Sequence, residues 1–352
     1  MRLATILFLS SLACAVVAAQ NAPTREPHPN NPAQAPFPEG KAGLAHANQL
    51  IGEGKYEEAI AELTALPAAQ PGVARQLGIA YYKQADYLRA SVYLEKAIAI
   101  DAADKEGVQL LGLSYFFIGK PKQAIPLLQR VQSWYPTANV DAAYVLGVSY
   151  IQVMDYDQAR KAFAAMYGVP ENSAASHLFL ARMLLRQGYD TVAETQAREA
   201  IELDSKLPLA HYLLGELYIF KSRIPEAVKE LEAELAINPG HAATYYRLAD
   251  AYTRVMKWED AEKLLQRSIW LDATASGPYI LMGKVLLKKG ESQLALRSLD
   301  RALNMDPNNY VGHYLRGQAY RNLGKNAEAE REMKLSEQLQ AAQNKTKLES
   351  VQ

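Results

Sequence analysis

Residues 77–81 read Leu-Gly-Ile-Ala-Tyr, and this short stretch decides the fold because it returns down the chain in altered form. Residues 111–115 read Leu-Gly-Leu-Ser-Tyr, and residues 214–218 read Leu-Gly-Glu-Leu-Tyr. The small residue recurs at Gly78, Gly112, Gly147, Ala181, Gly215, Ala249, Gly283 and Gly317. Successive members lie 34 residues apart, except for 35 between Gly112 and Gly147. A period of this length is typical of a stacked array of helical repeats.

Each period contains a second landmark, which predicts a second helix. An alanine follows the small residue after twelve positions, at Ala90, Ala124, Ala159, Ala193, Ala227, Ala261, Ala295 and Ala329. Apolar residues recur at spacings of three and four around both landmarks, as on the buried face of a helix. Pro121 and Pro225 fall where a second helix would start, and proline is tolerated there. Each unit is therefore expected to be two helices joined by a turn.

These residues resemble the tetratricopeptide repeat pattern, including its Leu-Gly-x-x-Tyr, Ala, large apolar and Pro positions. The resemblance extends over about residues 40–343 and implies an all-α fold, a right-handed superhelical solenoid of about nine helix-turn-helix repeats. The units are expected to begin near residues 40, 71, 105, 140, 174, 208, 242, 276 and 310. Beyond the charged end of the last unit, residues 344–352 are expected to be a frayed tail.

The start of the chain has the pattern of a secretory signal. Arg2 precedes an apolar stretch over residues 3–17, and small residues follow it, so residues 1–19 are expected to be removed before Gln20. This predicts an exported protein, periplasmic or secreted. Two alternatives are a membrane anchor and a lipid on Cys14, the only cysteine. Residues 20–39 hold six prolines and are expected to form a disordered linker.

Composition and motifs give no sign of chemistry. Lys plus Arg and Asp plus Glu both total 38, so the whole chain has no electrostatic footprint for nucleic acid or for an anionic membrane. No phosphate-binding glycine loop, nucleophile elbow or zinc-binding His-Glu-x-x-His pattern occurs. His177, His211 and His313 share the fourth repeat position, which predicts inward packing. We expect no catalytic residues, metal or cofactor, no nucleic-acid partner, and no membrane span after signal cleavage.

The resemblance implies a concave face lined by the first helices, where positions 2, 5, 9, 12 and 13 contact partners. The residues expected to bind a partner are Tyr82, Phe116, Phe117, Tyr144, Arg182, Arg186, Tyr212, Phe220, Tyr246, Arg254, Lys284, Lys288, Tyr314 and Arg321. Tyrosine and arginine suit protein recognition because both bury large polar-tipped surfaces. The earlier members are more apolar and the later ones more cationic, so the expected partner is a protein or peptide with an apolar and an acidic end.

The predicted function is a protein-interaction scaffold, in envelope assembly or export. One alternative is that the aromatic face binds or senses a glycan or a lipid. Self-association through the ends of the array is another. The structural alternatives stay open at this stage: some of these apolar residues could serve packing between neighbouring helices, and Arg182 with Arg186 could be a solvated helix face.

Overall fold

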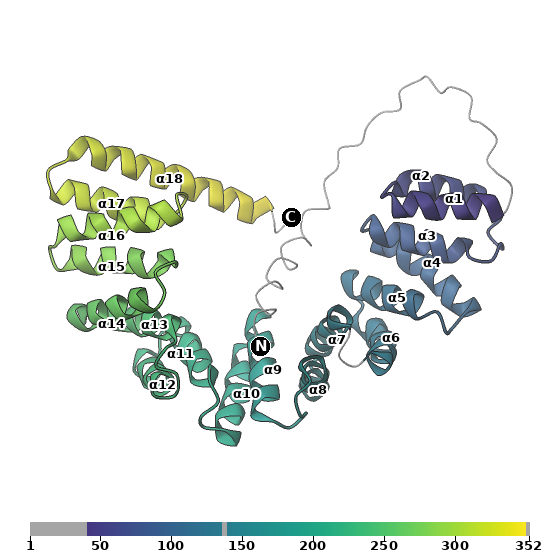
Figure 1. The fold of residues 1–352 in the computed structure, drawn as a ribbon, viewed down its shortest axis with the longest axis horizontal. Helices are drawn as coiled ribbons and strands as arrows, with labels where there is room; N and C mark the ends of the chain where they lie inside the picture. Colours follow the sequence, from purple (N-terminus) through teal and green to yellow (C-terminus); the bar gives the residue numbers. More distant parts are fainter. Residues whose placement is uncertain (1–40, 136–138, 350–352) are drawn as a thin grey trace. The chain divides into compact units, whose positions relative to one another are not determined.

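The computed structural model describes residues 41–135 and 139–349, and these contain 18 α-helices and no strand. This confirms the all-α class and the nine pairs of helices. The described helices divide between Leu203 and Asp204 into two compact parts, called here the N-terminal array and the C-terminal array. Figure 1 shows the helices of both arrays. The right-handed superhelix implied for the whole chain stays a prediction, as do the signal and linker at residues 1–39, which lie outside the described residues.

The N-terminal array contains ten helices: α1 (Lys41–Gly52), α2 (Tyr56–Ala65), α3 (Val73–Lys83), α4 (Tyr87–Ile100), α5 (Lys105–Phe117), α6 (Pro121–Trp134), α7 (Val140–Gln152), α8 (Tyr156–Tyr167), α9 (Ala174–Arg186) and α10 (Asp190–Leu203). The C-terminal array contains eight: α11 (Ala210–Phe220), α12 (Ile224–Ile237), α13 (Ala242–Arg254), α14 (Trp258–Leu271), α15 (Ser276–Lys288), α16 (Ser292–Met305), α17 (Tyr310–Asn322) and α18 (Asn326–Glu349). Odd-numbered helices are the first helices of their units, and even-numbered helices are the second.

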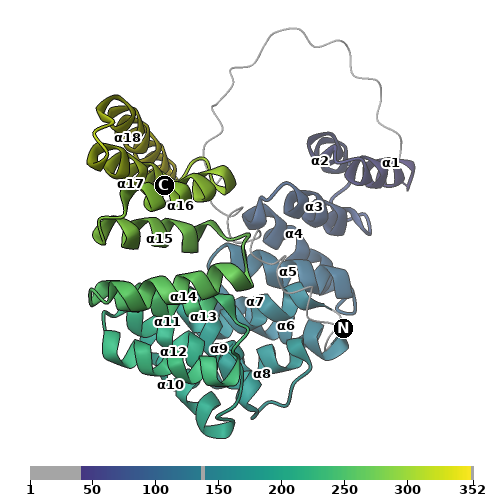
Figure 2. The same cartoon turned by 60° about the vertical axis from the view of Figure 1, so that its left-hand side comes forward.

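Stacking within each array creates two different faces. Every first helix packs on its own second helix, and most second helices also pack on the next first helix (Figures 1 and 2). First helices additionally contact each other, as in α3 with α5 and α13 with α15. The first helices therefore line one side of each array, called here the first-helix face. The outward sides of the second helices form the second-helix face.

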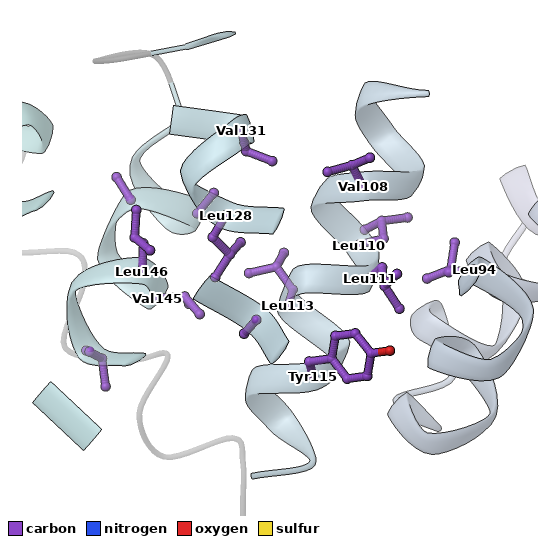
Figure 3. Packing of buried hydrophobic residues seen from close by; sticks show 14 of the residues in the cluster. Leu94, Val108, Leu110, Leu111, Leu113, Tyr115, Leu128, Val131, Val145 and Leu146 are labelled. Carbon is purple, nitrogen blue, oxygen red and sulfur yellow. The ribbon is translucent and has the colours of Figure 1, made fainter. Parts of the chain in front are cut away.

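The repeating small residue has a clear structural reason. A Cβ added to Gly78 would lie 2.6 Å from Cγ of Leu94, and one added to Gly215 would lie 2.5 Å from Cγ of Leu231. Glycine thus lets the second helix approach its partner closely, and both leucines are fully buried. Figure 3 shows the apolar layer that results around α5, with Leu94 and Leu128 on either side of Leu111.

Helix ends follow local chemistry, with one departure from expectation. Pro121 begins α6 and Pro225 is the second residue of α12, as predicted. The tail expected to fray from residue 344 is instead helical as far as Glu349. No glycine or proline follows Gly324, and Ala, Lys, Gln and Glu favour continuing a helix, so nothing in the sequence stops α18.

Candidate protein-binding surfaces

The predicted aromatic residues of the N-terminal array form a connected cluster. The rings of Tyr82 and Tyr87 meet edge to face at 5.4 Å between centroids, and Tyr87 stacks on Phe117 at 4.4 Å. Phe116 and Phe117 meet edge to face at 5.5 Å. Burial, with a smaller effect of Tyr87 and Asp141, raises the pKa of Tyr82 to about 12. These rings are partly exposed, but one face of Phe117 is covered by Tyr87, so the cluster also holds α3, α4 and α5 together.

The later predicted residues of the N-terminal array have fewer contacts with neighbouring side chains. Tyr144 is partly buried, with its ring 6.4 Å from that of Phe163. Arg182 and Arg186 are exposed on α9, and neither forms an ion pair with any described residue. Burial raises the pKa of Tyr167, while both arginines oppose that rise, which indicates that the two guanidinium groups lie near its ring. These two arginines are therefore free to meet an external acid.

A polar chain crosses the first-helix face of the C-terminal array. The Tyr212 hydroxyl donates to a Glu216 carboxylate oxygen at 2.7 Å, and Arg247 Nε donates to the same oxygen at 2.7 Å. Burial raises the pKa of Tyr212, and the Glu216 charge adds to that effect. Tyr246 lies beside Gly277, where an added Cβ would be 3.4 Å from its ring. Tyr212 and Tyr246 thus have structural partners that link α11, α13 and α15.

The cations of this face fall into two groups. Arg254 is held by Asp250, with Nη2 3.2 Å from the carboxylate. Lys289 is likewise paired, with Nζ 2.5 Å from Glu262. Lys284 and Lys288, one turn apart on α15, are exposed and form no ion pair within the described part of the chain. Within the C-terminal array, α15 therefore carries two uncompensated cations of the predicted site.

The remaining predicted residues project outward. Phe220 is 78% exposed at the end of α11, and Tyr314 is 47% exposed on α17. Arg321 is exposed, and its Nη2 lies 3.0 Å from the sulfur of Met333. The structure brings Lys284, Lys288, Tyr314 and Arg321 onto neighbouring first helices of one array, because α15 contacts α17.

The histidines at the fourth repeat position are structural. His177 bonds Gln196 at 2.9 Å, His211 bonds Glu230 at 2.6 Å, and each partner lies 19 residues later on the second helix. His313 repeats this with Glu332 and is buried, which confirms inward packing there. Residues 41–135 and 139–349 contain no group of three His, Cys, Asp or Glu side chains suited to a metal ion. In the same ranges no helix has the length and apolar character to cross a bilayer.

One cleft was missed by the sequence reasoning. It measures about 480 Å³ and lies between the starts of α5 and α7, lined by Lys105, Glu106, Gln109, Tyr135, Asn139, Val140 and Asp141. The Asn139 amide donates to the Gln109 side-chain oxygen at 2.7 Å. Glu106, Gln109 and Asp141 occupy repeat positions 2 and 5, so the same positional rule would have found them. None of the three is aromatic or cationic, and the predicted partner-binding residues are all of those two kinds.

Family models match much of the repeat region. Tetratricopeptide repeat models match residues 144–208, 244–279, 277–309 and 298–331. A model for anaphase-promoting complex, cyclosome, subunit 3 matches residues 83–166. The chain is a tetratricopeptide repeat protein. This family supports protein–protein interaction as the general function.

Individual relatives of this tetratricopeptide repeat protein are distant. It is 25% identical over 207 residues to the TPR repeat-containing protein YpiA of Bacillus subtilis, covering 57% of this chain and 47% of the relative. It is 22% identical over 282 residues to anaphase-promoting complex subunit 3 of Schizosaccharomyces pombe, covering 78% of this chain and 42% of the relative. The chain thus spans less than half the length of either curated relative.

Solved structures of similar fold include PilF of Pseudomonas aeruginosa and YrrB, described as a TPR protein with an unusual peptide-binding site. PilF gives a TM-score of 0.46 at 19% identity, over 55% of this chain and 88% of PilF. YrrB gives a TM-score of 0.43 at 22% identity, over 49% of this chain and 88% of YrrB.

Proposed function

We propose that this protein is an exported, non-catalytic scaffold that binds a partner protein on the first-helix faces of its two arrays, in envelope assembly or export. The observation that carries the proposal is the pair Lys284 and Lys288. Their charges are exposed and uncompensated, whereas Arg254 and Lys289 nearby are neutralised by acids of the chain itself. An exposed pair of like charges one turn apart does not help the helix fold, so an external acid is the natural partner.

The two arrays offer different chemistry to that partner. The N-terminal array presents the partly exposed edges of Phe116 and Phe117, which suit an apolar side chain. The C-terminal array presents Lys284, Lys288 and Arg321 beside the exposed ring of Tyr314, which suits carboxylates. A partner with an apolar segment and an acidic segment would satisfy both surfaces. The mutual packing of Tyr82, Tyr87 and Phe117 leaves fewer free ring faces for stacking on a sugar, so we favour a protein over a glycan.

A direct test uses two fluorescent peptides of the same length, one with an apolar half and a Glu-rich half, the other with Gln in place of Glu. The Glu peptide should bind the full chain more tightly, and added salt should weaken it. Lys284→Gln with Lys288→Gln should weaken binding of the Glu peptide roughly tenfold. Each lysine would form one exposed ion pair with a glutamate of the peptide, and such a pair contributes up to about 1 kcal/mol. The matched control is Lys229→Gln with Lys263→Gln, which removes the same charge from the second-helix face. Equal affinity for both peptides, or equal loss in both double variants, would refute the site.

Export rests on the sequence of residues 1–19 and is tested separately. Mass spectrometry of the protein purified from its native cell should find Gln20 at the mature N-terminus. A lipid-modified Cys14 there would make the protein membrane-anchored instead, and an intact Met1 would contradict export.

A further inference from the structure

Tyr167 is a second-helix residue that lies among first-helix side chains of the N-terminal array. It is the last residue of α8, and the centroid of its ring is 4.1 Å from that of Phe179 on α9. Its electrostatic neighbours are Tyr144 on α7 and Arg182 and Arg186 on α9. Three successive helices thus bring two phenol rings and two guanidinium groups together. These four residues, Tyr144, Tyr167, Arg182 and Arg186, are called here the tyrosine–arginine site.

The polar groups of the tyrosine–arginine site have no partner inside the described chain. The rings of Tyr144 and Tyr167 are partly buried, and neither hydroxyl forms a hydrogen bond within residues 41–135 and 139–349. Arg182 and Arg186 are exposed and form no ion pair in the same ranges. Like charges four residues apart disfavour their helix, so folding does not account for the two arginines. Two hydroxyl donors and two guanidinium groups are left for a group from outside.

The acids on the surrounding helices do not neutralise this site. α9 contains no acid, and the only one on α7 is Asp141, in its first turn. Asp141 helps to raise the pKa of Tyr82, which places it toward the aromatic cluster of α3 to α5. On α8, Asp157 pairs with Arg160 at 2.5 Å and with Lys161 at 3.7 Å. Neither acid pairs with the arginines of α9.

The acids between these helices are also placed elsewhere. Asp155 caps α8 and adds to the raised pKa of Tyr150. Glu171 is exposed in the loop before α9, and Asp190 begins α10, where it favours the helix dipole. Burial raises the pKa of Tyr167, the two arginines oppose that rise, and no carboxylate of the described residues acts on it. The local charge at the tyrosine–arginine site is therefore positive.

A single carboxylate fits this set of donors. A guanidinium group binds both oxygens of a carboxylate in a forked arrangement, and the charges strengthen each hydrogen bond. A carboxylate accepts about four hydrogen bonds, so the hydroxyls can satisfy its remaining lone pairs. The rings of Tyr144 and Tyr167 pack near Phe163 and Phe179, so the hydroxyl donors are positioned before a ligand arrives.

The tyrosine–arginine site lies at a defined distance from the apolar surface of Phe116 and Phe117. Phe117 is the last residue of α5 and Arg186 the last of α9, so both lie at the same ends of equivalent helices. These helices are two repeats apart, and packed helices are about 8–10 Å apart, so the separation is roughly 20 Å. An extended chain advances about 3.3 Å per residue, so roughly six residues span this distance.

We propose that the tyrosine–arginine site is a second acid-binding subsite, which takes one Glu or Asp side chain of the partner. That side chain lies about six residues from the apolar side chain held by Phe116 and Phe117, in an extended segment of the partner. The inference rests on the proposed function, because it describes the same partner more closely. It adds an acidic residue to the segment that binds the N-terminal array, beside the acidic segment already assigned to the C-terminal array.

The test uses labelled peptides of equal length that carry one apolar pair and one Glu, separated by about three, six or ten residues. Fluorescence anisotropy with the full chain should show about tenfold tighter binding at a separation of six than at three or ten. Arg182→Gln with Arg186→Gln should abolish this preference. Tyr144→Phe with Tyr167→Phe keeps both rings and removes only the hydroxyls, so it should weaken the six-residue peptide roughly fivefold.

The matched control is Lys96→Gln with Lys122→Gln, which removes the same charge from exposed positions on the second helices of this array. It should leave the preference for the six-residue separation intact. Equal affinity at all three separations, or an equal loss in the lysine and arginine variants, would overturn the subsite. If the chain still discriminated the Glu-rich from the Gln-rich peptide in that case, the proposed function would stand and only this inference would fail.

Discussion

The two helices of a repeat approach closely at Gly78, so a glycine-to-alanine change there should destabilise the protein, although the same change usually stabilises a helix. In an open helix this change stabilises by about 1 kcal/mol through helix propensity. At Gly78 the new Cβ would lie 2.6 Å from Leu94 Cγ, 2.8 Å from its Cδ2 and 3.2 Å from its backbone nitrogen. Ordinary contact begins near 3.4 Å, so Leu94 must move by roughly 0.8 Å. A new rotamer does not relieve the contact with the backbone, so α4 itself must shift.

Overpacking of this kind costs about 1–3 kcal/mol, and we expect the upper half of that range because the backbone is involved. After the gain in propensity, Gly78→Ala should lower the free energy of unfolding by about 1–2 kcal/mol. The matched control is Gly52→Ala at the end of α1, in the same array, where an added Cβ meets nothing within 4 Å. It should be neutral or stabilising.

Urea unfolding of the full chain, followed by far-ultraviolet circular dichroism, measures both changes as shifts of the midpoint at constant slope. A midpoint for Gly78→Ala at or above that of the wild type would show that α3 and α4 can move apart at Gly78 without loss of stability. A fall in Gly52→Ala as large as in Gly78→Ala would show that the loss has another origin than steric contact.

Three further predictions concern side chains. Glu234 is fully buried and accepts from the backbone N–H of Leu209 at 2.9 Å, so Glu234→Ala should destabilise the C-terminal array by about 1–3 kcal/mol in urea unfolding, and Glu234→Gln by less. Burial alone would raise the pKa of Glu332, but its neighbouring cations outweigh burial and hold that pKa below the ordinary 4.5. Its ionised form therefore stabilises the fold above about pH 4.5, and this stability is lost as pH falls through the lowered pKa; acid titration of Glu332→Gln should show a smaller loss. Phe117→Ala should cost about 1 kcal/mol beyond its lost burial, while Phe220→Ala, at 78% exposure, should leave the melting temperature unchanged.

The sequence predicted the helix pairs well because packing requires a fixed residue type at a fixed spacing. Gly215 must be small for Leu231 to fit, and both recur with the period of the array. Proline likewise marks the start of a helix, as at Pro121, because its fixed φ and missing N–H suit the first turn. These are local rules, so a single chain displays them without any knowledge of its three-dimensional neighbours.

The candidate sites were harder to predict because side-chain availability depends on contacts between helices. Phe117 looked free for a ligand at its repeat position, but Tyr87 from the next helix covers one face. Tyr212 looked equally free, yet Glu216 and Arg247 engage its hydroxyl through a chain that spans two units. Nothing in the periodicity of one helix indicates that Tyr87 or Arg247 is a partner, because Tyr87 lies 30 positions before Phe117 and Arg247 lies 31 positions after Glu216.

Charge compensation explains why the cations of the C-terminal array are not equivalent. Arg254 has an acid four residues earlier on its own helix, and Lys289 has Glu262 on the preceding second helix. Lys284 and Arg301 have neither, although all four side chains would carry the same formal charge at neutral pH. A cation without an acidic partner in the chain does not stabilise the fold through an ion pair. Folding therefore does not explain its position, and binding of an external anion can.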